Sequence, residues 1–354
     1  GGKTMFLPPL FYFYISQDIV SKTRCWSSIF FKNLSTVIHS FVDNYVEYME
    51  KLYKMARAGG ITAPIFHNDA YIAGLYADCV DIYACDIYPY INPRNDWKKD
   101  TFAFGTIDNL EELNRTFKED SPIFVAELQS GWFDKWLGVG YDKIREDLNW
   151  QHINIMTKTA LSQGVALFNH YMAAGGTSWD DLACDEVYTS YDFCAPIDEF
   201  GNLKPNYFKA KEINYFLQSF DFTQTEPKDF EFNKENIYTK LRHDLNNYCD
   251  WLFIRNLNNT TEELDILDKK VKIRPFDMKI CPVNLKLKAC EVEFSDVEIF
   301  ARLQNENEEK KKEYNADIVG LCFSYPAEIL DNGTARIITF SPIERHTSQS
   351  HSVL

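Results

Sequence analysis

The sequence lacks the cysteine spacings of zinc and redox sites. It has nine cysteines, an odd number, and no two of them form a C-x-x-C pair. This pattern favours reduced thiols over a disulfide framework or a structural zinc ion. No cluster of His, Cys and Asp has metal-ligand spacing either, so we expect neither a metal nor another cofactor.

The sequence is also poor in basic residues. It has 37 Lys and Arg against 52 Asp and Glu, a net charge of −15, whereas a nucleic-acid partner needs a basic surface. It has no run of 18 apolar residues, so we expect no membrane span. The apolar stretch at 6–15 is short, is broken by Pro8 and Pro9, and lacks the small-residue cleavage site of a signal peptide. Cellular location is left open.

Aromatic residues are abundant, at 15% of the chain, with 7 Trp, 20 Tyr and 27 Phe. We expect most of them in the core. A sugar is a natural ligand for the others, because the C–H face of a pyranose ring lies flat on an aromatic ring.

Residues 41–220 alternate between helical and strand patterns. In the helical pattern at 107–120, Asp108 is the expected N-cap, with Glu111 three residues later. This alternation favours parallel strands joined by right-handed crossovers. Helices are expected at 41–60, 107–120 and about 141–162, and strands at 63–69, 80–89, 123–129 and the start of 164–176.

Each expected strand is apolar along most of its length and polar at its carboxyl end. In a parallel barrel these ends form one rim, where active sites lie. A doubly wound sheet is the alternative, although no glycine-rich phosphate turn follows any strand. The polar ends are His67–Asp69, Asp86–Tyr88, Glu127–Gln129 and Asn169–Tyr171.

The pattern changes after residue 220. Alternation of Val283, Leu285, Leu287 and Ala289 with polar residues predicts an antiparallel sheet with one solvated face. The fold class expected is therefore α/β then all-β, with a β-sandwich-like region at 221–354. In it we expect strands within 250–259, 270–294 and 335–340, a charged loop at 305–313 and a loose C-terminal tail, whereas residues 1–40 form an unassigned leader.

Glu127 lies at the end of one expected strand, directly before the aromatic-rich segment 131–138. A carboxylate in this position suits glycoside hydrolysis, where it stabilises or attacks an oxocarbenium-like centre. By position alone, a structural ion pair is an equally ordinary role for such a residue.

Three ordered motifs resemble glycoside hydrolase family 35, the β-galactosidases. AELQSGWFDKWLG, which contains Glu127, is similar to the nucleophile motif of that family. The other two lie in 63–71, APIFHNDAY, and in 169–201, which contains GGTSW and SYDFCAPIDEFG. The resemblance covers about 41–220 well and the β region loosely.

The resemblance implies a (β/α)8 TIM barrel followed by β domains, and hydrolysis of terminal β-galactosides with retention. It implies that Glu127 is the catalytic nucleophile. The implied substrate-binding residues are Trp132, Tyr191 and Phe193, and Phe193 stands where the family has a tyrosine. Tyr88, at the polar end of the second expected strand, is a further candidate substrate-binding residue.

The resemblance also implies that part of the family site is missing. The four expected strands correspond to barrel strands 5–8, and the Asn-Glu motif that carries the family's acid/base does not occur before residue 41. We weighed His67 and Asp69 as substitute acids and favour a structural role for His67, and we expect His170 to pack. The solvated Glu47 and Glu50 are dismissed.

Three hypotheses follow. The chain is a β-galactosidase by family, a catalytically inactive fragment that at most binds carbohydrate, or a vestigial barrel part attached to an independent carbohydrate-binding or scaffolding module at 221–354. A partner carrying the missing N-terminal barrel half would restore the site in the first case.

Overall fold

A computed structural model describes residues 34–70, 74, 76–89, 97–98, 107–180, 182–183, 188–287, 291–304 and 318–323. The expected strand at 335–340, the charged segment at 305–313, the C-terminal tail and most of the leader lie outside this part of the chain. Within the described residues, no helix has the length and apolar character needed to cross a membrane.

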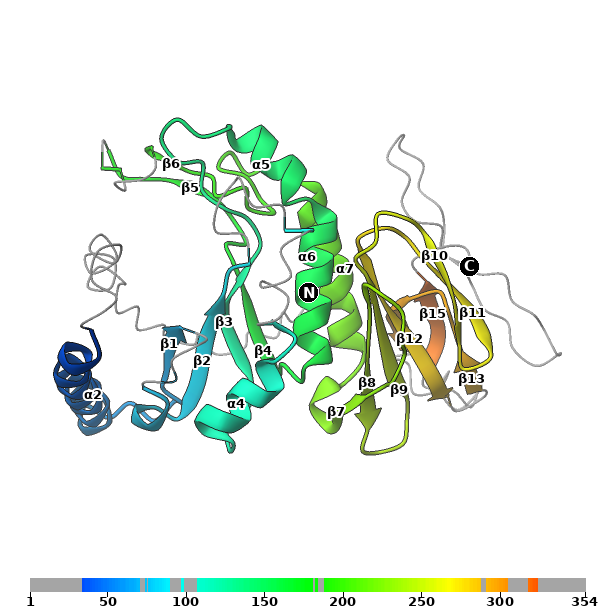
Figure 1. The fold of residues 1–354 in the computed structure, drawn as a ribbon, viewed down its shortest axis with the longest axis horizontal. Helices are drawn as coiled ribbons and strands as arrows, with labels where there is room; N and C mark the ends of the chain where they lie inside the picture. The colour runs from blue at the N-terminus through cyan, green and yellow to red at the C-terminus, as the bar shows by residue number, and fades with distance from the viewer. Residues whose placement is uncertain are drawn as a thin grey trace, which may run out of the picture.

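The four strands expected in the first part of the chain form one parallel sheet in the order β1-β2-β3-β4. The α/β prediction is therefore confirmed, with boundaries shifted by up to three residues at the strand starts. Strands β5 and β6, of two residues each, pair antiparallel and lie beyond one end of the sheet (Figure 1). The strands are β1 (Phe66–Ala70), β2 (Ile82–Ile87), β3 (Phe124–Gln129), β4 (Leu167–Tyr171), β5 (Gly176–Thr177) and β6 (Ser190–Tyr191).

Helices connect these strands. The helix expected from 41 begins earlier, at Leu34, and the one expected over 141–162 is divided. The division has a local cause, because the Asn149 side chain accepts a hydrogen bond from the Gln151 amide at 2.9 Å and starts a new helix. The helices are α2 (Leu34–Ala58), α4 (Leu110–Lys118), α5 (Tyr141–Asp147), α6 (Trp150–Ser162) and α7 (Pro205–Ser219), with short 3₁₀ turns η1 (Ala77–Cys79) and η2 (Phe222–Gln224).

The prediction that Asp108 caps a helix is wrong. Helix α4 is preceded by Asn109, whose side chain makes no capping hydrogen bond. Both carboxylate oxygens of Asp108 instead accept hydrogen bonds, each 2.7 Å long, from the buried Arg255 guanidinium. A bidentate ion pair to a buried cation is stronger than one capping bond, so the tertiary partner overrides the local motif.

The second part of the chain is antiparallel, as expected. Five strands form a sheet in the order β13-β12-β9-β8-β7, and β10-β11 and β14-β15 form separate pairs. The strands are β7 (Thr225–Asp229), β8 (Ile237–Asp244), β9 (Asp250–Asn256), β10 (Glu262–Ile266), β11 (Lys269–Ile273), β12 (Asp277–Lys286), β13 (Glu291–Phe294), β14 (Ile299–Gln304) and β15 (Ile318–Phe323).

The expectation of one solvated face is confirmed at the end of β12, where Leu285 is buried between the exposed Asn284 and Lys286. It is wrong for the central strand β9, because every residue of β9 after Asp250 is buried. On one face, Leu252 and Ile254 pack with the β10–β11 pair. On the other face, Trp251 and Phe253 belong to the same hydrophobic core as the parallel sheet. Both faces are covered, so burial is continuous along the strand instead of alternating.

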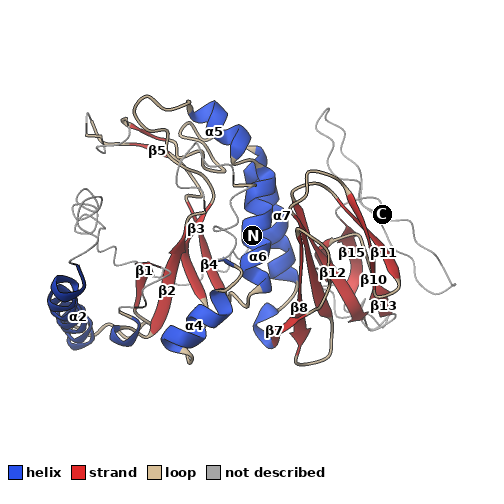
Figure 2. Ribbon diagram, viewed as in Figure 1, coloured by secondary structure: helices blue, strands red, loops and turns tan. Residues whose placement is uncertain are grey.

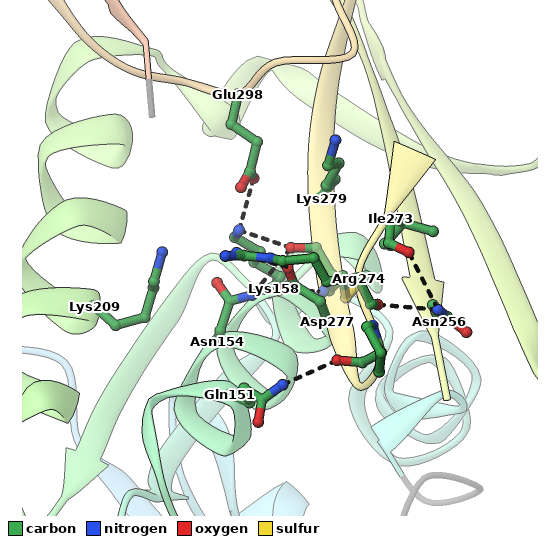
Figure 3. A network of polar contacts seen from close by, with 12 residues as sticks. Gln151, Asn154, Lys158, Lys209, Asn256, Ile273, Arg274, Asp277, Lys279 and Glu298 are labelled. Carbon is green, nitrogen blue, oxygen red and sulfur yellow. Dashed lines mark hydrogen bonds and ion pairs between the residues drawn. The ribbon is translucent and has the colours of Figure 1, made fainter. Parts of the chain in front are cut away.

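Helices α6 and α7 stand between the parallel and the antiparallel sheets (Figures 1 and 2). Eleven successive residues of α6, 152–162, are buried, as expected of a helix enclosed on every side. A polar network also crosses this boundary (Figure 3). In it, Lys158 contacts Glu298 at 2.6 Å and the Met278 carbonyl at 2.8 Å, and Asn154 donates to Asp277 at 2.8 Å. Residues 221–304 therefore share their core and their polar contacts with the α/β part.

The enclosed helix α6 carries His152, which is fully buried against Trp97. Burial lowers the pKa of the His152 imidazole from its ordinary 6.5 to about 3. Between these pH values the unfolded chain binds a proton that the folded chain does not. We therefore expect His152 to contribute a fall in the free energy of unfolding of about 1.4 kcal/mol per pH unit as pH decreases from 6.5 towards 3.

Urea unfolding of the wild type and of His152→Leu at several pH values measures this contribution. The unfolding free energy of the wild type, minus that of His152→Leu, should be constant above pH 6.5 and should fall as the pH decreases below 6.5. A difference that stays constant down to pH 4 would show that His152 keeps an ordinary pKa in the folded state.

Candidate active site

Glu127 is the charged residue of β3 and only 8% exposed. One of its oxygens, Oε2, accepts a 2.5 Å hydrogen bond from the hydroxyl of Tyr88, which follows the neighbouring strand β2. In the register of the two strands, Asp86 lies beside Glu127. Polar groups from adjacent parallel strands thus meet at their carboxyl ends, as the sequence predicted.

Burial, followed by the charge of the adjacent Glu127 carboxylate, raises the pKa of Tyr88 well above its ordinary value. The Tyr88 hydroxyl therefore stays protonated and keeps donating to Glu127 throughout the ordinary pH range. The hydrogen bond fixes the orientation of the carboxylate.

Aromatic rings from three further segments surround this pair. The Tyr88 ring meets the ring of Trp132 edge to face, with centroids 5.5 Å apart, and that of Tyr171 at 6.2 Å. The hydroxyls of Tyr171 and Tyr191 lie 2.9 Å apart. The Trp132 indole N–H is buried and meets no acceptor in the described part of the chain. The structure thus brings Trp132, Tyr88 and Tyr191 to one cluster around Glu127.

Phe193 occupies a different position from the other predicted site residues, because its side chain is 0% exposed. Its ring lies 5.3 Å from that of Tyr171, 6.0 Å from that of Trp132 and stacked at 6.1 Å on that of Tyr191. The ring therefore supports the cluster from beneath. Such burial argues against direct contact of Phe193 with a ligand.

Two glycines allow the segments of the cluster to approach each other. A Cβ at Gly131 would lie 1.9 Å from the Phe193 carbonyl oxygen, and one at Gly175 would lie 2.6 Å from the Asp192 carbonyl oxygen. No larger residue fits at either position without moving the turn at 192–194. Packing therefore requires the glycine of the Gly-Trp sequence in the first motif, and this packing fixes the position of Trp132.

The turn at 192–194 is stabilised by the buried Asp192. Its carboxylate forms an ion pair with Arg145 of α5 and accepts hydrogen bonds of 3.0 Å from the amides of Cys194 and Glu199. Phe193 and Cys194 both have left-handed backbone conformations, with φ of 56° and 54°. The bonds from Asp192 to Cys194, Glu199 and Arg145 offset the cost of this unfavourable geometry.

Asp134 stabilises the aromatic segment after β3 in a similar way. The side chain is buried, accepts a hydrogen bond from the Gly140 amide at 3.0 Å, and binds the hydroxyl of Tyr188. Burial, together with the Asp134 charge, raises the pKa of Tyr188 to about 12.

The side chains of the two histidines considered from the sequence pack against other elements. His67 pairs in register with Tyr83, and its ring packs edge to face on Tyr76 at 4.8 Å. The Nε2 atom of His170 lies 2.9 Å from the hydroxyl of Thr157 on α6, and burial lowers the pKa of His170 to about 4. Both placements agree with the packing roles favoured from the sequence.

Sequence reasoning missed Tyr171 as a site residue. It is the last residue of β4, pairs in register with Gln129, and contacts the rings of Tyr88 and Phe193. Its position at a polar strand end was the available signal. Among the described residues, no three His, Cys, Asp or Glu side chains are grouped so that they could hold a metal ion.

Comparison with protein families identifies the family of this chain. The family model described as "Glycosyl hydrolases family 35" matches residues 27–216, just over half of the chain and all of the cluster around Glu127. The chain belongs to glycosyl hydrolases family 35.

Named relatives of this family 35 chain are β-galactosidases. It is 31% identical over 206 residues to the probable beta-galactosidase C of Talaromyces marneffei, which covers 54% of the chain and 20% of the relative. It is 33% identical over 183 residues to beta-galactosidase A of Aspergillus oryzae, which covers 49% of the chain and 18% of the relative. The chain thus spans about a fifth of the length of the curated relatives it matches.

Solved structures resemble the family 35 chain only slightly. An endo-beta1,6-glucanase overlaps 68% of the chain and 52% of its own length, with 10% identity and a TM-score of 0.39. A score this low supports no conclusion about fold or function.

Proposed function

We propose that this chain carries the nucleophile half of a retaining β-galactosidase site, with Glu127 as nucleophile. The observation that carries the proposal is the buried Glu127 carboxylate, oriented by the Tyr88 hydroxyl at 2.5 Å and surrounded by aromatic rings at a strand end. Membership of family 35 supplies the substrate class, a terminal β-galactoside.

We further propose that the parallel sheet is the second half of a (β/α)8 barrel, with β1–β4 as barrel strands 5–8. In support, the strands pair in sequence order, and their polar ends lie on one side. In the described residues, β1 and β4 each have a neighbour on one side only. Leu167 of β4 is correspondingly 42% exposed. A partner carrying the other half of a barrel would pair with these two edges. We also propose that residues 221–354, which contain the antiparallel strands, are the second domain of the chain.

In the proposed first step, a Glu127 oxygen attacks C1 of the galactoside. A C–O bond to Glu127 forms, and the bond from C1 to the leaving oxygen breaks with its electron pair. Tyr88 orients the carboxylate, and Trp132 and Tyr191 form the walls that contact the sugar, with Phe193 beneath them. The acid/base glutamate that protonates ordinary leaving groups is absent from this sequence, so only leaving groups that need no proton depart readily.

The test uses 2,4-dinitrophenyl β-galactoside, whose phenolate departs without a proton. We expect mass spectrometry of the intact protein to detect a galactosyl adduct, and peptide mapping to place it on Glu127. Because Gln is a far weaker nucleophile, Glu127→Gln should form no adduct.

Glu112→Gln is the matched control, since Glu112 is exposed on α4 and the substitution is chemically identical. This variant should form the adduct at the wild-type rate. An adduct on another residue, or one that persists in Glu127→Gln, would reject Glu127 as the nucleophile. Absence of any adduct would favour the second candidate function, an inactive fragment that at most binds carbohydrate.

A further inference from the structure

An open hollow of about 510 Å³ adjoins the cluster around Glu127. It continues from the site along the chain and in space, because Met172 directly follows the site residue Tyr171, and Tyr191 lines both the cluster and the hollow. Residues 174–179, which include β5, and residues 182 and 183 provide most of the remaining wall.

The lining of the hollow is mainly apolar, and two of its large apolar side chains are exposed in the described structure. Trp179 is 84% exposed and Leu182 is 69% exposed. The floor is open above Gly176, where an added Cβ would meet no atom within 4 Å. Exposed tryptophan and leucine beside an empty floor present a flat apolar surface to a ligand.

The wall is held in place by hydrogen bonds to neighbouring segments. Glu199 binds the hydroxyl of Thr177 and accepts a 2.5 Å hydrogen bond from the Ser190 hydroxyl, which links β5 to β6. The Ser178 amide donates to the Thr189 carbonyl at 2.7 Å. The surface that carries Trp179 is therefore built before a ligand arrives.

We infer that this hollow receives the leaving group of the galactoside, and that it selects leaving groups with a flat apolar face. The inference rests on the proposed function, which places galactose against Glu127, Tyr88 and Tyr191. A group attached to C1 of that sugar then extends past Tyr191 towards Trp179. An aryl ring and the C–H face of a second sugar share this chemistry, and the experiment separates them.

The test compares three ligands that are not hydrolysed or are hydrolysed very slowly, by saturation-transfer NMR titration of the full chain. They are methyl β-galactoside, phenyl 1-thio-β-galactoside and a thio-linked galactosyl-glucose. An aromatic contact of this kind is expected to tighten binding about 2- to 10-fold over methyl β-galactoside. A gain for the phenyl compound alone identifies an aryl preference, and a gain for the thiodisaccharide identifies a sugar.

Two variants test whether the gain in affinity over methyl β-galactoside depends on the hollow. Trp179→Ala removes the apolar surface, and Gly176→Val fills the floor without a predicted clash of its Cβ. Each should reduce the gain to about 1-fold and leave the affinity for methyl β-galactoside unchanged. Phe200→Ala is the matched control, because Phe200 is 85% exposed and does not line the hollow.

The outcomes separate this inference from the proposed function. If methyl β-galactoside binds but neither larger ligand binds more tightly, or the gain survives in both variants, the inference is overturned and the proposed function stands. If none of the ligands binds, both are rejected. If a larger ligand binds through Trp179 and methyl β-galactoside does not bind, the hollow binds apolar groups without a galactose site, and both the inference and the proposed function are rejected.

Discussion

Azide is expected to accelerate turnover of 2,4-dinitrophenyl β-galactoside by this chain about 10²- to 10⁴-fold, the range typical of general acid–base assistance. The reason lies in the second step of the proposed reaction. Water must lose a proton as it attacks the galactosyl ester of Glu127, and the proposal assigns no residue of this chain to accept that proton. Azide is already an anion, so it attacks without a base.

The bonds in this step define the product. A C–N bond forms at C1, the ester bond breaks, and the electron pair returns to the Glu127 carboxylate. Two successive inversions at C1 give β-galactosyl azide. Steady-state release of dinitrophenolate measures the acceleration, and proton NMR of the product determines its configuration.

Sodium chloride at the same ionic strength is the control for a salt effect and should leave the rate unchanged. Release of α-galactosyl azide would mean that azide displaced the phenolate directly, without Glu127. A wild-type chain that turns over rapidly without azide would show that another residue supplies the base, and the proposed absence of an acid/base group would be wrong.

The second large effect is expected at the boundary between the two parts of the chain. Glu298→Gln should lower the free energy of unfolding by about 3 kcal/mol, because it leaves the Lys158 ammonium buried without a counter-charge. The Lys158 side chain is 3% exposed, and its nitrogen lies 2.6 Å from Glu298 Oε1 (Figure 3). Glutamine keeps the shape of Glu298 and an oxygen to accept the 2.8 Å hydrogen bond of the Ile280 amide.

Urea unfolding followed by circular dichroism and by tryptophan fluorescence measures this cost. The double variant Lys158→Met with Glu298→Gln should recover part of the loss, since no charge then remains buried. Glu146→Gln is the matched control, because the Lys143–Glu146 pair is exposed and such pairs contribute about 0–1 kcal/mol.

The same titrations test whether the two parts unfold together. The shared core predicts coincident transitions for the two probes, which would speak against the antiparallel region as an independent module. Separate transitions, with only the later one sensitive to Glu298→Gln, would show that the antiparallel region folds independently.

The sequence alone determined the order and type of the main elements between residues 41 and 171, and the position of the candidate nucleophile. Short apolar runs that become polar at their carboxyl ends placed all four parallel strands, and the motif around Glu127 identified the family that the comparison confirms. These features are local: a strand pattern depends on a few consecutive side chains, and the carboxyl end of a strand is defined by the chain direction. The roles of Glu127, Tyr88, Trp132, Tyr191 and Phe193 remain predictions.

Only the tertiary structure decided which partner each side chain meets. Asp108 looked like a helix cap until Arg255, far along the chain, was brought beside it. Strand β9 is buried on both faces because α6 covers one of them, and Phe193 lies beneath the cluster because Gly131 lets its turn approach. Periodicity reports that a face is buried, but it does not report which distant element covers it, because that depends on contacts between residues separated by many positions in sequence.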